Sequence, residues 1–329
     1  DEIVNKLFTK LNSELDKDCK NSRLRKLSYD CIFGTDANPR MSRTAKMNMI
    51  MHGDGHGGVH HHDGLLNVNG IFENRFDVIL TNPPFGARIE KSLKITKEDE
   101  FTDEYRIKKY QERYGKEVYT QALNQINGNI NKSVLSLYET GEMSTLTEVL
   151  FIERCLNLLK AGGRMGIVLP EGVLNNSNLQ KVRDFVESKA KILLIVSIPQ
   201  DVFIASGATV KPSLLFFKKF TDDESEKYKN IKNEATLTIN AKYQEQLTII
   251  EEKLALKGKE ALKSEEKKKL RSDKKALEEK IEAEIKVQIK EKFNYEIPIA
   301  EVEKAGISTT GAIIENELEP LQEEFKIYK

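Results

Sequence analysis

The chain is 329 residues long, enough to bury a full core, and its 52 basic and 52 acidic residues cancel. This balance excludes a global field that attracts nucleic acid, so any such surface must be local or supplied by a partner. No apolar run approaches the roughly 20 residues of a membrane span and the N-terminus lacks a signal-peptide pattern, so we expect a soluble cytoplasmic protein with no membrane contact.

The first quarter of the chain predicts two helices and two strands. Residues Ile3–Leu15 have helical spacing and belong to a helical lead-in that we place at residues 1–28. Tyr29–Asp36 predicts a strand that ends in an acidic residue, and Pro39 then opens a helix that reaches about Met51. After a loop rich in glycine and histidine, Phe76–Leu80 predicts a short buried strand.

Residues 88–141 interrupt this alternation. They are polar and too long for an ordinary connection, so we expect a functional insertion. Helices are then predicted at Thr147–Leu159 and Leu179–Lys189, and strands at Arg164–Leu169, Ile192–Ile198 and Pro212–Phe220. Strands alternating with helices predict an α/β unit over residues 29–220 with a mostly parallel sheet.

The remaining sequence is of a different kind. Residues 243–293 are dominated by Lys, Glu, Ala and Leu, with apolar residues at helical spacing and Gly258 as the candidate turn. We expect a helical hairpin or an antiparallel coiled coil. A solvated spacer and an arm that docks a partner both fit this composition. Residues 294–329 form a C-terminal tail with loop signals and a short last helix.

The most informative segment is Phe76–Gly86, in which an apolar strand leads directly into Asn82, Pro83, Pro84 and Phe85. Open α/β sheets bind their ligands at the carboxyl ends of strands. An amide, two rigid residues and an aromatic ring are the groups that an enzyme needs to hold a planar amino group and alkylate it. A turn after a core strand is the alternative without chemistry.

The segment resembles the catalytic motif of amino-methyltransferases that act on adenine N6 in DNA, and the resemblance suggests how such a reaction is assisted. Adenine N6 is a poor nucleophile because its lone pair is delocalised into the ring. The side-chain oxygen of Asn82 and the carbonyl of Pro83 can accept both N–H groups and localise that pair, while Pro84 restricts Pro83 to an extended conformation. Phe85 offers a face on which a flipped base can stack, so catalysis would rest on positioning and preorganised electrostatics.

Two acidic residues fit the nucleoside part of S-adenosylmethionine. Asp36 ends a strand that precedes a helix, where a carboxylate can accept hydrogen bonds from ribose hydroxyls, although an acid there is often only an N-cap. Asp63, in the segment His62-Asp63-Gly64-Leu65, is placed to accept from the adenine amino group of the cofactor. Alone it would be an ordinary turn residue, but the order of both acids ahead of Asn82 favours the functional interpretation.

The chain carries few other candidate ligands. All five histidines lie within eleven residues: His52, His56, His60, His61 and His62. Imidazole binds zinc readily, but adjacent histidines on a Gly-rich loop without a thiol do not easily converge on one ion, so we predict no metal and a structural or cofactor-flanking loop. Cys19, Cys31 and Cys155 are too few and too scattered for a disulfide framework or zinc site, which indicates a reducing compartment.

Six segments together resemble one family: Phe33–Met41, Met51–Asp54, Asp63–Leu66, Thr81–Gly86, Gly166–Gly172 and Pro212–Lys218. Over about residues 29–220 the chain is similar to the modification (M) subunit of type I restriction–modification systems. The resemblance implies a Rossmann-like S-adenosylmethionine-dependent methyltransferase that methylates adenine N6 in DNA, with specificity and restriction subunits as partners. It implies catalytic roles for Asn82, Pro83, Pro84 and Phe85, and cofactor binding by Asp36, Asp63, Gly64, Leu65 and Asn82.

The chain departs from this family at its amino end. In the family a first sheet strand and a Gly-rich loop precede the strand that ends at Asp36, yet the first glycine here is Gly34. The family fold places that strand between those ending at Asp36 and Thr81, so we expect a gap in the sheet. A fragment, a gene split so that a second chain supplies the Gly-rich loop, and a degraded inactive relative all explain this. The intact catalytic segment favours the first two, in which this chain alone would bind the cofactor poorly.

Two other functions fit the residues less well. Glutamine N5 methylation in a protein presents a similar planar amino group, but the insertion and the C-terminal helices are unexpected there, and position 85 more often carries Tyr. A non-catalytic assembly subunit with a methyltransferase-like sheet would account for the missing Gly-rich loop.

Overall fold

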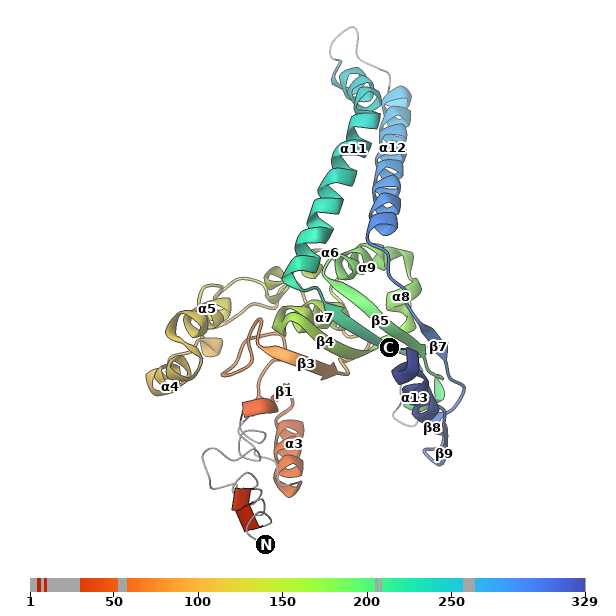
Figure 1. Ribbon diagram of the computed structural model, residues 1–329. Coiled ribbons are helices and arrows are strands. Elements are labelled where there is room, and N and C mark those ends of the chain that lie inside the picture. The colour runs from red at the N-terminus through yellow and green to blue at the C-terminus, as the bar shows by residue number, and fades with distance from the viewer. Residues whose placement is uncertain are drawn as a thin grey trace.

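The structure is a computed structural model that describes residues 5–6, 9–10, 30–52, 58–204, 207, 209–256 and 264–328. It has a five-stranded central sheet, helices packed on it, and a long helical hairpin that projects away (Figure 1). The predicted α/β class with a helical C-terminal extension is confirmed. Most of the predicted helix at Ile3–Leu15, together with Cys19, His56 and Gly258, lies outside the described residues.

The elements follow in chain order: β1 (Gly34–Asp36), α3 (Pro39–Met51), β2 (Val59–His61), β3 (Phe76–Thr81), η2 (Lys97–Asp99), α4 (Glu104–Tyr114), α5 (Lys116–Asn127), η3 (Val134–Leu137), α6 (Thr140–Met143), α7 (Thr147–Leu158), β4 (Leu159–Pro170), α8 (Glu171–Asn175), η4 (Ser177–Leu179), α9 (Gln180–Glu187), β5 (Ala190–Ser197), α10 (Asp201–Ile204), β6 (Pro212–Lys219), α11 (Asp222–Ala255), α12 (Ser264–Lys292), β7 (Ile299–Glu301), β8 (Ala305–Ile307), β9 (Ile313–Asn316) and α13 (Leu318–Tyr328). In the described part of the chain, no helix is both long and apolar enough to cross a membrane. Cys31 is exposed and Cys155 is buried, and both are free thiols. The division into units at residues 28, 220 and 293 stays a prediction.

The central sheet has the strand order β3-β4-β6-β5-β7. β3 and β4 pair in parallel, as do β5 and β7, whereas β6 is antiparallel to both β4 and β5. The expectation of a mostly parallel sheet is therefore wrong for β6. A parallel return to a neighbouring strand needs a long crossover. In the described part of the connection between β5 and β6 the only helix is α10, which has four residues, and the chain turns back antiparallel.

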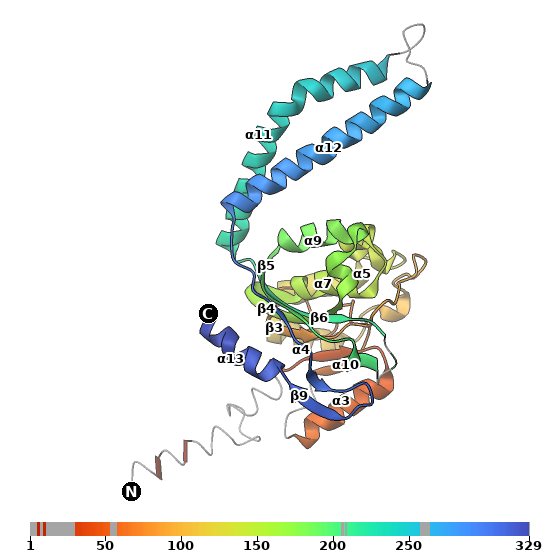
Figure 2. The ribbon, with the colours of Figure 1, turned by 90° about the vertical axis from the view of Figure 1, so that its right-hand side faces the viewer.

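Each face of the sheet has its own cover. Met165, Ile167 and Leu169 alternate along β4 and are almost fully buried against α7 and α9 on one face. On the other face, Leu214 and Phe216 of β6 pack against residues of α13. Figure 2 shows α7 and α9 on one side of the sheet and α13 on the other. The core is therefore centred on β4, β5 and β6.

The sheet is open at β3. β1 pairs in parallel with β2, with Asp36 opposite His61, and these two strands form a separate small sheet. Among the described residues no strand pairs with the outer edge of β3, and there Val78 and Leu80 are 61% and 78% exposed. The gap expected from the sequence is present. Of the predicted strand at Tyr29–Asp36, Tyr29 lies outside the described residues, residues 30–33 are not strand, and Gly34–Asp36 form β1. Among the described residues β1 pairs only with β2, and because β2 has three residues, β1 is equally short.

Two further element boundaries differ from the prediction. β4 begins at Leu159, ahead of the glycine pair expected to separate helix from strand. The glycine pair lies in a bulge of β4. Phe76 of β3 pairs with Leu159 of β4, but Val78 already pairs with Arg164, and Gly162 within the bulge has φ +76°. α11 begins at Asp222, well before residue 243, because a capping box between Thr221 and Glu224 starts it.

The helical hairpin has a narrow apolar seam and a polar surface. Ile239 and Tyr243 of α11 pack against Ile281 of α12. The ion pairs Lys242–Glu284, Lys274–Glu251 and Lys292–Glu234 join the two helices. Such exposed pairs contribute little each, so the seam is the main contact that keeps the helices together.

Glu224 fastens the root of the hairpin to the sheet. Its Oε1 accepts from Lys191 Nζ of β5 at 2.6 Å, and its Oε2 accepts from the Thr221 backbone N–H at 3.0 Å. Burial opposes ionisation of this carboxyl, but the hydrogen bonds from Lys191 and Thr221 outweigh it and lower its pKa to about 2.

Glu224→Gln should therefore lower the free energy of unfolding by about 1–3 kcal/mol at pH 7, since a charge-assisted hydrogen bond is lost. Because the pKa in the folded state lies below the unfolded value of 4.5, this stabilisation is present above pH 4.5 and disappears as the pH falls toward 2. Urea unfolding across that range measures it, with the exposed neighbour Glu226→Gln as control. A difference that stays constant with pH would contradict the assignment.

Candidate functional site

The Asn-Pro-Pro-Phe segment leaves the sheet at the carboxyl end of β3. Asn82 and Pro84 are exposed, Pro83 is buried and Phe85 is half-buried. In the described part of the chain the Asn82 side chain has no hydrogen-bond partner. Its amide is therefore available to a ligand.

Contacts from two helices hold this turn in place. The Phe85 ring packs edge-on against Phe203 of α10, with 5.6 Å between centroids and an interplanar angle of 84°. Gly86 adopts φ +69° and donates its N–H to Glu148 Oε1 of α7 at 3.1 Å. The next carbonyl, of Ala87, accepts from the backbone N–H of Thr147 at 2.9 Å. The amino end of α7 thus fixes where the segment points.

Glu148 is a site residue that the sequence did not reveal. Its side chain is only 3% exposed, and its Oε2 is buried without a hydrogen-bond partner among the described residues. In the sequence it is one more acidic residue at a helix start, a common position because of the helix dipole. Only the packing shows that its carboxylate accepts the N–H that follows the Asn82–Phe85 turn.

The two predicted cofactor acids lie together at the carboxyl ends of β1 and β2. The Oδ1 of Asp36 accepts from the Asn38 N–H at 2.7 Å, and the Oδ1 of Asp63 accepts from the Leu65 N–H at 2.9 Å. The His62 N–H donates to the Asp36 carbonyl at 3.2 Å and joins the two segments. Asn38, not Asp36, is the N-cap of α3. Each acid thus uses one oxygen to shape its own turn.

A buried arginine holds the segment that follows Asp63. Arg154 of α7 is 1% exposed, and its guanidinium donates to the Gly64 carbonyl at 3.1 Å, the Leu66 carbonyl at 2.9 Å and Asn67 Oδ1 at 2.7 Å. A fourth hydrogen bond, at 3.2 Å, goes to Glu73 Oε1. These bonds satisfy the buried charge and fix the backbone from Gly64 to Asn67.

Packing alone accounts for a glycine at position 64 and an apolar residue at position 65. A Cβ on Gly64 would lie 2.9 Å from the ring of Phe151, so only glycine allows this close packing. Leu65 is buried, and its carbonyl accepts a hydrogen bond from the Tyr138 hydroxyl. Their role in cofactor binding stays a prediction.

Helix α7 contacts both halves of the site. Glu148, Phe151 and Arg154 are spaced by three residues. Glu148 contacts the predicted catalytic segment at Gly86, Phe151 contacts Gly64, and Arg154 contacts the backbone at Gly64 and Leu66. Within the described residues no hydrogen bond joins Asn82 to Asp36 or Asp63, because β1 and β2 are not part of the sheet that contains β3.

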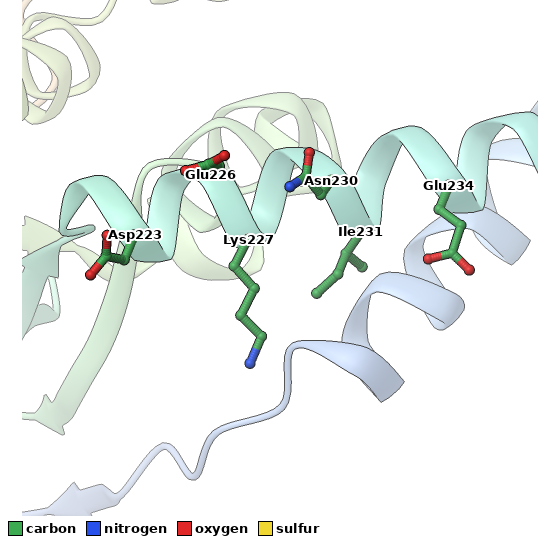
Figure 3. A pocket seen from close by; sticks show the side chains of 6 residues that line it. All are labelled: Asp223, Glu226, Lys227, Asn230, Ile231 and Glu234. Carbon is green, nitrogen blue, oxygen red and sulfur yellow. The ribbon is translucent and has the colours of Figure 1, made fainter.

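Two other kinds of candidate site in the described part of the chain would be a metal cluster and a hollow on α11. No group of three or more His, Cys, Asp or Glu side chains in the described part could hold a metal ion. A hollow of about 400 Å³ on α11 is lined by Asp223, Glu226, Lys227, Asn230, Ile231 and Glu234. Figure 3 shows that Lys227 and Ile231 point toward the carboxyl end of α12. That hollow belongs to the hairpin root and contains no residue of the predicted site.

The sequence also matches a family of methyltransferases. The profile of N-6 DNA methylases matches residues 7–115 and 136–302, which together form most of the chain. The chain belongs to the N-6 DNA methylase family. The methylase subunit of the type I restriction enzyme EcoEI from Escherichia coli is 25% identical over 190 residues, which are 57% of this chain and 30% of that protein. The matched part thus spans less than a third of this relative, and the predicted resemblance to type I modification subunits is confirmed.

Two solved structures are similar as well. One comes from a study of complex assembly in a type I R-M system; it is 24% identical, with a TM-score of 0.41, and covers 59% of this chain and 32% of that chain. The other is the M protein of the type I restriction enzyme EcoKI, 21% identical with a TM-score of 0.42, covering 67% and 36%.

Arg154→Met should loosen the Gly64–Asn67 segment and lower the free energy of unfolding by about 3 kcal/mol, because four acceptors, two of them in buried hydrogen bonds, lose their donor. Urea unfolding gives the stability, and hydrogen exchange of the Leu65 and Leu66 amides gives the local effect. Arg164→Met, an exposed site on β4, should change stability by less than about 0.5 kcal/mol. Unchanged exchange in Arg154→Met would show that the arginine does not hold this segment.

Proposed function

We propose that this chain is the catalytic part of a DNA methyltransferase that transfers a methyl group from S-adenosylmethionine to adenine N6, as the modification subunit of a type I restriction–modification system. The observation that supports this most directly is the exposed Asn82 side chain at the end of β3, on a turn fixed by Phe203 and Glu148.

The residues of the chain would bind and activate the amino group. The Asn82 side-chain oxygen and the Pro83 carbonyl accept the two N6–H groups, which localises the nitrogen lone pair toward the methyl carbon. The Phe85 ring is nearly perpendicular to that of Phe203, and it would stack on the extruded base. As the new N–C bond forms, the C–S bond of the donor breaks and one N6 proton leaves to solvent. The contribution of the chain is positioning and electrostatics.

The described residues fit half of the cofactor. Bound S-adenosylmethionine supplies the electrophilic methyl group. Asp36 and Asp63 each have one carboxylate oxygen bound to a backbone N–H and a second oxygen that can accept from ribose hydroxyls and the adenine amino group. Their positions at adjacent strand ends suit one nucleoside.

The catalytic assignment predicts the behaviour of Asn82→Ala. With labelled S-adenosylmethionine and adenine-containing DNA, the variant should lose about 100-fold or more of the methyl transfer rate, as expected for removing one preorganised contact. Thermal stability should not change, because Asn82 is exposed. Asn230→Ala, an exposed site on α11, is the matched control.

Three outcomes separate the candidate functions. Unchanged transfer in Asn82→Ala would refute the assignment. Label in protein and none in DNA would favour glutamine N5 methylation. Where the chain alone is inactive, the same pair of variants is assayed together with a specificity subunit and with a polypeptide that carries a Gly-rich strand-turn-helix. Inactivity under all these conditions would favour an assembly subunit.

The missing half of the cofactor site belongs at the open edge of β3. A strand added there would pair with β3 and lie toward β1, and a helix following it would cover Val78 and Leu80. The Gly-rich loop between the added strand and helix would hold the methionine part of the cofactor. This unit is part of the proposal, as are the specificity and restriction subunits.

The chain alone should therefore bind S-adenosylmethionine with a Kd of about 1 mM or weaker, corresponding to about 4 kcal/mol. Titration calorimetry measures this, and a longer product of the same locus that includes the strand and loop should bind at least about tenfold more tightly. Asp36→Ala in the longer product should remove most of that gain. Tight binding by this chain alone would contradict the need for an added strand.

A further inference from the structure

A second hollow lies beside β2, away from the catalytic segment in the sequence, and we call it the histidine pocket. Its volume is about 520 Å³, and α3, β2 and α4 contribute to its lining. The lining residues with polar or aromatic side chains are Lys46, His60, His61, His62, Asn69, Tyr105, Arg106, Lys109 and Tyr110. Three of them are permanent cations and none is a carboxylate. In a chain with no net charge, this is a local excess of positive charge.

These cations are available to a ligand. Within the described residues neither Lys46 nor Lys109 forms an ion pair. Arg106 uses its Nε for Asp103 at 3.2 Å, and the two side chains are 68% and 54% exposed. Such an exposed pair is worth little and leaves the outer guanidinium nitrogens for another anion.

His60 gives a second and independent sign of a ligand. The Asn69 amide nitrogen lies 3.1 Å from His60 Nδ1, so Nδ1 accepts and the ring proton sits on Nε2. That Nε2 is buried and has no hydrogen-bond partner among the described residues. A buried donor without an acceptor is destabilising, and a bound acceptor would remove that cost.

The electrostatics at His60 agree with this picture. Burial, and after it the positive charges of Lys46, His62 and Arg106, together lower the pKa of His60 to about 4. The ring is therefore neutral at pH 7. Its neighbours act on it as uncompensated cations, which is the field that an anion would meet.

The shape of the rim favours a nucleic acid over a small ion. Tyr105 of α4 is 79% exposed and lines the pocket together with the two cations of the same helix, Arg106 and Lys109. Cations for the backbone together with an exposed aromatic ring for a base or sugar are the combination used to bind DNA strands. The methyl donor carries no phosphate, so the pocket serves a different group although His62 directly precedes Asp63.

We propose that the histidine pocket binds a phosphodiester group of the DNA substrate, with Arg106, Lys109 and Lys46 facing the phosphate oxygens and His60 Nε2 donating to one of them. This rests on the proposed function, in which the substrate is DNA. It adds a contact that positions the duplex without reading its sequence.

Lys109→Ala and Lys108→Ala form a matched pair for the test. Both residues are exposed on α4 and both changes remove one positive charge, but only Lys109 lines the pocket. Fluorescence anisotropy with a labelled duplex is measured over a series of salt concentrations. Lys109→Ala should weaken binding about 3- to 10-fold and reduce the slope of log K against log salt by about 0.9, whereas Lys108→Ala should change neither.

The outcomes distinguish this inference from the proposed function. Equal effects of the two variants, or no effect of either, would overturn the pocket assignment while methylation of DNA by the wild-type chain would still stand. Competition by inorganic pyrophosphate without any loss of DNA affinity in Lys109→Ala would assign the pocket to a small anion and overturn the DNA assignment. Absence of wild-type DNA binding under all conditions would overturn both proposals.

Discussion

The candidate site depends on the buried positive charge of Arg154. The Arg154 guanidinium is removed from water, and an unpaired cation in that position would be very costly. Four acceptors from the backbone and side chains between Gly64 and Glu73 surround it. Because each acceptor must stay in place to satisfy the charge, the loop that carries Asp63 is held as a unit against α7.

The rest of α7 extends this principle to the catalytic segment. Glu148, two turns before Arg154, accepts the Gly86 N–H, and Glu153 accepts the backbone N–H groups of Glu139 and Thr140. A single helix thus uses three buried charged side chains to position the turn that we predict to be catalytic, the loop that we predict to bind the cofactor, and the backbone at Glu139 and Thr140. The insertion also joins the network, since Asn67 donates to the Ala122 carbonyl of α5.

Two parts of the chain lie outside this network: the edge of β3 and the helical hairpin. Val78 and Leu80 at the edge of β3 are apolar side chains in water beside unpaired backbone, which is an arrangement that a further strand would complete. The hairpin of α11 and α12 connects the middle strand β6 to the edge strand β7, and the ion pair between Glu224 and Lys191 ties it to the sheet. Ile239, Tyr243 and Ile281 fill the seam between its two helices.

The sequence by itself determined what depends on local order along the chain. The run from Phe76 to Gly86, the position of α7 and the amphipathic helices of the hairpin follow from short-range patterns, and the family match agrees with the motif. The tertiary structure decided what depends on neighbours: the antiparallel direction of β6, the shortness of β1, the acceptor role of Glu148 and the gathering of Lys46, His60 and Lys109 around one pocket. Strand length, burial of a charge and the clustering of cations are set by contacts between residues far apart in sequence, which no periodicity records.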